Sequence, residues 1–192
     1  RSMFLDGNEN AYLRFFALPE DEELSLDNGF TFQMWTRYAA EDNSRGSIFN
    51  KGTDIDLSYD GRNLYFIVGD REAVLPFENP IDTFFHVSAI YDPGAGVISI
   101  HARTNDNDLK SVEIAAGSEP SMLFADPFLF GRGRSVSGPY TGYIDEMRLW
   151  NLPLDSTVMA RDYSRFIFGN EDDLVGYWRL NAGIETDFYD LS

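Results

Sequence analysis

Short apolar runs recur along the chain, and residues that favour turns separate them. The runs are rich in Phe, Tyr, Val and Ile, which favour strands over helices. Turn chemistry marks several of the breaks, including Asp27-Asn28-Gly29, Asp60-Gly61 and Asp92-Pro93-Gly94. The pair Asp60-Gly61 lies between two such runs and predicts a tight hairpin. The predicted strands are residues 11–16, 30–38, 46–50, 55–59, 64–68, 73–77, 84–91, 97–102, 111–114, 127–130, 143–150 and 175–180.

About a dozen short strands at roughly 8–12-residue spacing are typical of a sandwich or jelly roll. One stretch departs from the strand pattern. Residues 155–163 begin with the N-cap candidates Asp155 and Ser156 and continue with residues compatible with a helix of about two turns. The predicted fold class is therefore an all-β, two-sheet antiparallel jelly-roll sandwich with one short helix.

The predicted strand 143–150 carries two unusual features. In a regular strand, Ile144 faces the side opposite to Met147 and Leu149. If all three are core residues, the strand shifts phase between 144 and 147, which a β-bulge would achieve; otherwise the strand is regular and buried on both faces. The same run holds the acidic pair Asp145-Glu146. Because a buried carboxylate needs a partner, we expect a metal ion or backbone amides to receive one of them.

Length and composition fit one domain over residues 1–192, with 185–192 as a frayed tail or the start of a linker. Arg1-Ser2 reads as a cut within a longer chain. The formal net charge of −17 repels phosphate, which argues against nucleic acid and anionic membranes as partners. The absence of cysteine excludes disulfides and thiol catalysis. No apolar stretch is long enough to span a membrane.

The pattern of carboxylates argues against an enzyme. Retaining glycoside hydrolysis needs an acid and a nucleophile about 5 Å apart. Only residues 185–190 approach the spacing Glu-x-Asp-x-x-Glu, and their last position is Asp. Asp145 and Glu146 are adjacent in one strand and would face opposite sides. His86 and His101 lie on separate predicted strands and form no zinc pattern. We predict no catalytic residues and no enzymatic activity.

Six segments carry recognisable motifs. Residues 141–151 read Thr-Gly-Tyr-Ile-Asp-Glu-Met-Arg-Leu-Trp-Asn, and the other segments are residues 4–13, 29–35, 48–52, 85–92 and 174–181. In their order along the chain, these segments resemble the motifs of the laminin-G-like (concanavalin A-like) jelly-roll domains. Residues 141–151 match the family's Gly-x-Ile-Asp-Glu-Val-Arg-Ile-Trp-Asn segment. Phe85, where the family usually has Trp, is a mild departure.

The resemblance implies a structural Ca²⁺ ion, because related folds often hold one where the first strand, a glycine turn and the late Asp meet. Transfer by matching motif gives Asp6, the carbonyl of Gly29 and Asp145 as ligands, with Asn8 as a further candidate. Oxygen ligands of this kind are those that Ca²⁺ prefers. The alternative is that Asp6 and Asp145 cap turns or pair with Arg148.

The resemblance also implies a binding function. The first hypothesis is a non-catalytic, carbohydrate-binding module of an exported, multidomain bacterial protein, located at the cell surface, in the periplasm or outside the cell. The second is a structural or adhesion module that contacts neighbouring domains or another protein; the third, a glycoside hydrolase, is disfavoured. The candidate ligand-binding residues, expected at strand ends or loops, are Tyr38, Tyr59, Arg132, Arg134 and Tyr140. Each Tyr could instead pack as an ordinary rim residue.

Overall fold

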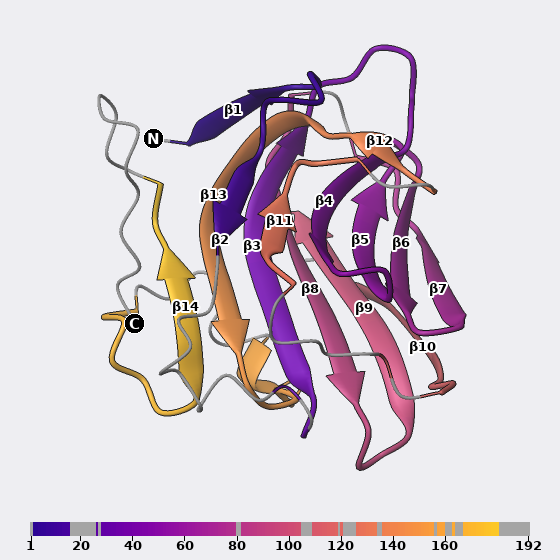
Figure 1. Cartoon of the computed structure of the whole chain (residues 1–192), viewed down its shortest axis with the longest axis vertical. Coiled ribbons are helices and arrows are strands. Elements are labelled where there is room, and N and C mark those ends of the chain that lie inside the picture. Colours follow the sequence, from indigo (N-terminus) through magenta and orange to yellow (C-terminus); the bar gives the residue numbers. More distant parts are fainter. Residues whose placement is uncertain are drawn as a thin grey trace.

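The computed structural model describes residues 2–15, 26, 28–79, 82–104, 109–118, 120, 126–133, 136–155, 157–159, 163 and 167–180. Within these residues the chain forms strands that stack as two layers (Figure 1). The strands are β1 (Met3–Asp6), β2 (Leu13–Phe15), β3 (Phe30–Tyr38), β4 (Gly46–Lys51), β5 (Ile55–Tyr59), β6 (Asn63–Val68), β7 (Arg71–Pro76), β8 (Phe85–Asp92), β9 (Val97–Thr104), β10 (Lys110–Ala115), β11 (Phe128–Phe130), β12 (Gly138–Pro139), β13 (Thr141–Trp150) and β14 (Leu174–Trp178).

The strands form two seven-stranded sheets within the described residues. The first has the order β1-β13-β3-β8-β9-β10, with β14 also paired to β13. The second has the order β2-β11-β4-β5-β6-β7, with β12 also paired to β4. Neighbouring strands are antiparallel, apart from the short parallel contact between β12 and β4. The predicted two-sheet antiparallel sandwich is confirmed.

The core lies between the sheets and follows the two-residue period of the strands. In β3, Phe30, Phe32 and Met34 are fully buried. Phe32 stacks on Phe49 of the opposite sheet with ring centroids 4.4 Å apart, and such aromatic pairs stabilise a core beyond the area that they bury. Trp150 and Trp178 are buried and Trp35 is half-buried.

The phase shift predicted in the strand 143–150 is confirmed. The register between β13 and β3 changes between Asp145 and Arg148. Glu146 takes a positive φ of 50°, a backbone region that non-glycine residues rarely adopt. As a result Ile144, Met147 and Leu149 are all fully buried. The bulge therefore places the two carboxylates at the point where the strand changes phase.

Residues 157–159 are helical, in the stretch where the sequence predicts a short helix. The Asp155 carboxylate accepts the backbone N–H of Thr157 at 2.7 Å, as an N-cap does. The Met159 N–H donates to the Asp155 carbonyl at 3.0 Å, and the Tyr163 N–H donates to the Met159 carbonyl at 3.1 Å. The rest of the predicted helix lies outside the described residues.

Candidate ligand-binding site

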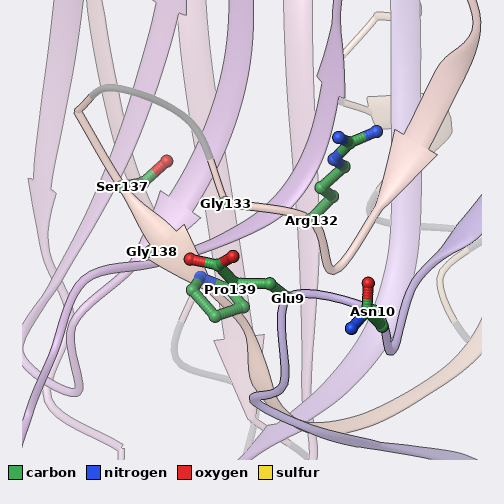
Figure 2. Close-up of a pocket in the computed structure, with 7 residues that line it drawn as sticks. All are labelled: Glu9, Asn10, Arg132, Gly133, Ser137, Gly138 and Pro139. Atoms are coloured by element: carbon green, nitrogen blue, oxygen red, sulfur yellow. The ribbon is translucent and has the colours of Figure 1, made fainter.

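A pocket of about 320 Å³ lies where the loop after β1, the turn after β11 and strand β12 meet (Figure 2). In Figure 1 this is the upper end of the sandwich, where β1 and β12 lie. Three of the seven lining residues are Gly or Pro, and the other four carry polar or charged side chains. The lining consists of Glu9, Asn10, Arg132, Gly133, Ser137, Gly138 and Pro139.

Two successive side-chain turns shape the wall that carries Glu9 and Asn10. The Asp6 carboxylate accepts the backbone N–H of Asn8 at 2.9 Å, and the Asn8 side-chain oxygen accepts that of Asn10 at 3.1 Å. Such Asx turns need no other part of the protein to form. Gly7 has a φ of 75°, and an added Cβ would meet Thr141 Oγ1. The Asp6-Gly7-Asn8 sequence therefore fixes the backbone that presents Glu9 and Asn10.

The opposite wall is a loop that is closed at its base. The backbone N–H of Tyr140 donates to the Gly131 carbonyl at 2.9 Å, and the N–H of Gly131 donates to the Ile48 carbonyl at 3.0 Å. Gly131 has a φ of 82°, and a Cβ there would lie 2.4 Å from Leu5 Cδ1. The side chain of Asn50 donates to the Arg132 carbonyl at 2.8 Å. These contacts hold Arg132 at a defined place above the sheet.

A buried carboxylate supports the pocket from below. Asp56 is fully buried and accepts hydrogen bonds from the hydroxyls of Ser47 at 2.6 Å and Ser58 at 2.8 Å. The hydroxyl of Ser137, which lines the pocket, lies 3.3 Å and 3.4 Å from its two oxygens. A buried carboxylate needs such donors, so Asp56 ties the pocket wall to strands β4 and β5.

The charged groups of the pocket are spread apart. The Arg132 guanidinium lies over the ring of Tyr12, 4.8 Å from the ring centroid, with Nη1 3.5 Å from the Tyr12 hydroxyl. In Figure 2 the guanidinium points away from the carboxylate of Glu9. No hydrogen bond or ion pair among the described residues uses the side chain of Glu9 or Asn10. The residues that line the pocket therefore include a cation, an anion and an amide.

Of the predicted ligand-binding residues, Arg132 lines the pocket and Arg134 lies outside the described residues. Tyr38 and Tyr59 end strands β3 and β5 and Tyr140 lies between β12 and β13, as predicted, but the expectation that their rings are open to a ligand is wrong. All three are buried in the core, where a ring has no free face to offer.

Each of these buried tyrosines has a hydrogen-bond partner for its hydroxyl. Tyr38 donates to the Ser44 carbonyl, Tyr59 to the Phe77 carbonyl, and Tyr140 shares a hydrogen bond with Thr36 Oγ1. Burial raises the pKa of Tyr38 to about 12 and also raises the pKa of Tyr59 and Tyr140.

The predicted calcium ligands do not meet in this structure. Asp6 pairs with Thr141, four residues along β13 from Asp145, which is about 13 Å at 3.3 Å per residue. Gly29 precedes β3 by one residue, whereas Asp145 pairs with Trp35 near the other end of β3. The three residues therefore do not fit a joint Ca²⁺ site. Among the described residues, no three His, Asp or Glu side chains are grouped for a metal ion. Calcium binding stays a prediction, which melting curves with Ca²⁺ and with a chelator would test.

Side chains of Tyr177, Arg148 and Arg179 and one backbone amide contact the acidic pair at the bulge. The Tyr177 hydroxyl donates to Glu146 at 2.5 Å, and nitrogen atoms of Arg148 and Arg179 lie 3.6 Å and 3.5 Å from its carboxylate. The Asp145 carboxylate accepts the backbone N–H of Glu146 at 3.0 Å. Burial, with the Glu146 charge as a second cause, raises the pKa of Asp145 to about 6.

The two histidines, His86 and His101, make contacts with neighbouring side chains. His86 is buried with its ring centroid 5.5 Å from that of Trp35. Burial, helped by the charges of Arg148 and Arg103, lowers its pKa to about 3. His101 lies 3.2 Å from the Ser99 hydroxyl. Residues 185–190 lie outside the described residues.

The family follows from a comparison with protein-family models. The model described as "Concanavalin A-like lectin/glucanases superfamily" matches residues 6–158. The chain belongs to this family. The match includes both walls of the pocket and strand β13. A comparison with curated proteins finds no match.

Solved structures with the same fold come from proteins of different kinds. A Bacteroides ovatus protein described as a candidate carbohydrate-binding protein has a TM-score of 0.73 and 15% identity, over 98% of this chain and 54% of that one. The CBM40 domain of the Ruminococcus gnavus IT-sialidase, bound to α2,3-sialyllactose, has a TM-score of 0.63 and 11% identity, over 84% of this chain and 95% of that one. The enzymatically active domain of bacteriophage CBA120 tailspike protein 2 has a TM-score of 0.61 and 12% identity, over 96% of this chain and 32% of that one.

At these identities the likeness shows the fold alone. The chain spans about half the length of the Bacteroides ovatus protein and a third of the tailspike chain. Because one of these structures is of a sugar-bound module and another of an enzyme domain, function has to be argued from the site.

Sequence reasoning missed Glu9, Asn10 and Ser137 as pocket residues. The signal for the first two lies in the Asp6-Gly7-Asn8 turn, in which Asp6 and Asn8 are predicted calcium ligands. No local signal marks Ser137, because strand β12 has two residues and no periodicity.

Proposed function

We propose that this chain is a non-catalytic carbohydrate-binding module and that the pocket beside Arg132 is its binding site. The observation that carries the proposal is the set of polar groups around this pocket: the carboxylate of Glu9, the amide of Asn10 and the guanidinium of Arg132. A sugar presents hydroxyl groups that donate and accept hydrogen bonds, so it can use a carboxylate, an amide and a guanidinium at once.

The same pocket supports the proposal that the module is non-catalytic. Glycoside hydrolysis by two carboxyl groups needs both beside the scissile bond. Among the described residues that line the pocket, Glu9 is the one carboxylate. Asp56 lies beneath it but is fully buried and accepts hydrogen bonds from serine hydroxyls. The sugar-bound Ruminococcus gnavus module adds support for binding by this fold, and the tailspike domain makes a direct activity assay necessary.

We also propose that the module acts in an exported protein with further domains. The described residues contain no helix long and apolar enough to cross a membrane. Fractionation of cells that express the full-length gene would test the location. Single sugar-binding sites often bind weakly, and linkage to other modules raises avidity.

A multivalent glycan panel tests the proposed function. We expect the wild-type module to bind a subset of glycans, and we expect Arg132→Ala and Glu9→Gln each to weaken that binding by about tenfold, the value of one good polar contact. The matched controls are Arg62→Ala and Glu78→Gln, which change exposed residues that do not line the pocket. No release of reducing sugar is expected from any bound glycan.

Three results would contradict the proposal. Equal binding by Arg132→Ala and Arg62→Ala would show that the pocket is not the binding site. Turnover of a bound glycan would show an enzyme. A wild-type module that binds nothing on a broad multivalent panel would favour the structural or adhesion role.

A further inference from the structure

Four side chains from neighbouring strands form a row on the outer face of the first sheet. Phe4 of β1 pairs with Tyr143 of β13, and Tyr143 pairs with Arg37 of β3. Phe84 directly precedes Phe85, the partner of Thr36 in β8. The row, which we call the aromatic platform, is Phe4, Tyr143, Arg37 and Phe84. With strands about 4.8 Å apart, three spacings give it a length of about 14 Å.

Contacts between these side chains hold the platform together. The rings of Phe4 and Tyr143 have centroids 4.7 Å apart. The Arg37 guanidinium lies over the Tyr143 ring at 4.1 Å and over the Phe84 ring at 5.5 Å. A guanidinium between two rings is a favourable cation–π arrangement. The platform is therefore ordered before any ligand arrives, which lowers the entropic cost of binding.

The platform is open to solvent and has polar groups at its side. Phe4 exposes 49% of its surface, although it lies in a strand. The Asp82 carboxylate lies 3.5 Å from Arg37 Nη1, and its side chain is 71% exposed. Asp82 has a positive φ of 66°, so the turn before Phe84 directs this carboxylate beside the rings. The row combines the exposed ring of Phe4 with a partly exposed guanidinium and an exposed carboxylate.

The platform lies on the other side of β1 from the pocket. Successive residues of a strand point to opposite faces. Leu5 points inward, where its Cδ1 lies against Gly131 at the base of the pocket loop. Phe4 therefore points outward, and the platform shares no residue with the pocket.

We infer that the aromatic platform is a second ligand-binding site, and that its ligand is a neutral oligosaccharide. The apolar face of a pyranose ring fits the face of an aromatic ring, and its hydroxyls fit an arginine and a carboxylate held side by side. The net charge of −17 and the exposed Asp82 repel anionic sugars. A protein partner would need roughly 800 Å² on each side, more than four partly covered side chains supply.

The platform as a second site rests on the proposed carbohydrate binding, so the experiment has to distinguish the platform from the pocket. Migration is measured in native gels that contain β-glucan, xyloglucan, galactomannan or, as the anionic probe, polygalacturonate. The variants are Phe4→Ala, Phe4→Leu, Arg132→Ala and the double variant Phe4→Ala/Arg132→Ala. The matched control is Phe168→Ala, because Phe168 is 81% exposed and lies in the segment before β14, whose Leu174 pairs with Trp150 at the far end of β13.

We expect at least one neutral polysaccharide to retard the wild-type protein and polygalacturonate to leave it unretarded. Arg132→Ala should keep part of the retardation, and adding Phe4→Ala should remove the rest. Phe4→Leu should behave like Phe4→Ala, because leucine keeps the apolar character but has no ring face. Melting curves of the variants should match the wild type closely, since Phe4 is half-exposed.

Four results would overturn the platform. They are equal retardation of Phe4→Ala and Phe168→Ala, complete loss of retardation in Arg132→Ala alone, no retardation of the wild type by any neutral polysaccharide, and a concentration-dependent dimer that Phe4→Ala abolishes. The last result would make the platform an interface between copies. Loss in Phe4→Ala together with no effect of Arg132→Ala would keep the platform and reject the pocket.

Discussion

At the scale of single residues, the carboxyl of Asp145 shows how the fold changes the chemistry of one side chain. Burial and the neighbouring Glu146 raise its pKa to about 6 from an ordinary 3.8. Glu146, by contrast, has Tyr177, Arg148 and Arg179 around it. The sequence indicated that this acidic pair needs partners. It could not show that Tyr177 and Arg179 are among these partners, because the pairing of β14 with β13 depends on the tertiary fold.

The pKa of Asp145 sets a pH dependence of stability. Between about pH 4 and pH 6 the folded state binds more protons than the unfolded state, so the free energy of unfolding falls as pH rises through this window. Asp145→Asn keeps an oxygen for the Glu146 N–H and removes the charge. We expect it to raise stability by about 1–2 kcal/mol at pH 7.5 and to give no gain at pH 4.

Thermal denaturation at four pH values between 4 and 7.5 measures this difference. Asp172→Asn, which removes one negative charge at an exposed turn, is the control. A gain from Asp145→Asn of the same size at pH 4 and pH 7.5 would show that the effect does not come from titration of this carboxyl.

At the scale of elements, the sequence predicted the periodic strands better than the turns and short strands. The bounds of β3 and β5 were predicted to the residue, because both are flanked by turn residues. Strands β1 and β12 were missed, since they contain four and two residues and show no repeat. Tyr59 ends β5 as predicted but is buried rather than open to a ligand, because it shares the parity of Ile55 and Leu57 and so belongs to the core face.

The loop that holds Arg132 depends on the backbone conformation of Gly131. In Gly131→Ala the new Cβ would meet Leu5 at 2.4 Å in a backbone with a φ of 82°. Gly96→Ala is the matched control, because Gly96 has a φ of 70° but nothing within 4 Å of the added Cβ. We expect a loss of about 1 kcal/mol for Gly96→Ala and about 2–4 kcal/mol for Gly131→Ala, which adds overpacking.

Urea denaturation of both variants measures the two losses. In the absence of urea, Gly131→Ala should also weaken glycan binding, because the substitution displaces the loop that holds Arg132. Equal losses of stability in the two variants would show that Leu5 moves aside freely and that the base of the loop is not tightly packed.

At the scale of the whole molecule, the acidic surface and the proposed neutral ligand predict different responses to salt. The net charge of −17 produces self-repulsion, which salt screens over about 10 Å at 0.1 M. We therefore expect the melting temperature to rise between low and moderate NaCl concentration. Binding of a neutral glycan releases no counterions, so its Kd should change by less than about twofold over the same range. A Kd that rises steeply with salt would indicate a charged ligand.

The central claim, that the pocket between Glu9 and Arg132 binds carbohydrate, is tested most directly by an NMR titration. The ¹⁵N-labelled module is titrated with an oligosaccharide of the glycan that binds best on the panel. We predict fast, saturable shifts of the backbone amides of Asn10, Arg132, Gly133 and Gly138, and their loss in Arg132→Ala. Shifts that leave these four amides in place while others move, or no shifts at all, would contradict the claim.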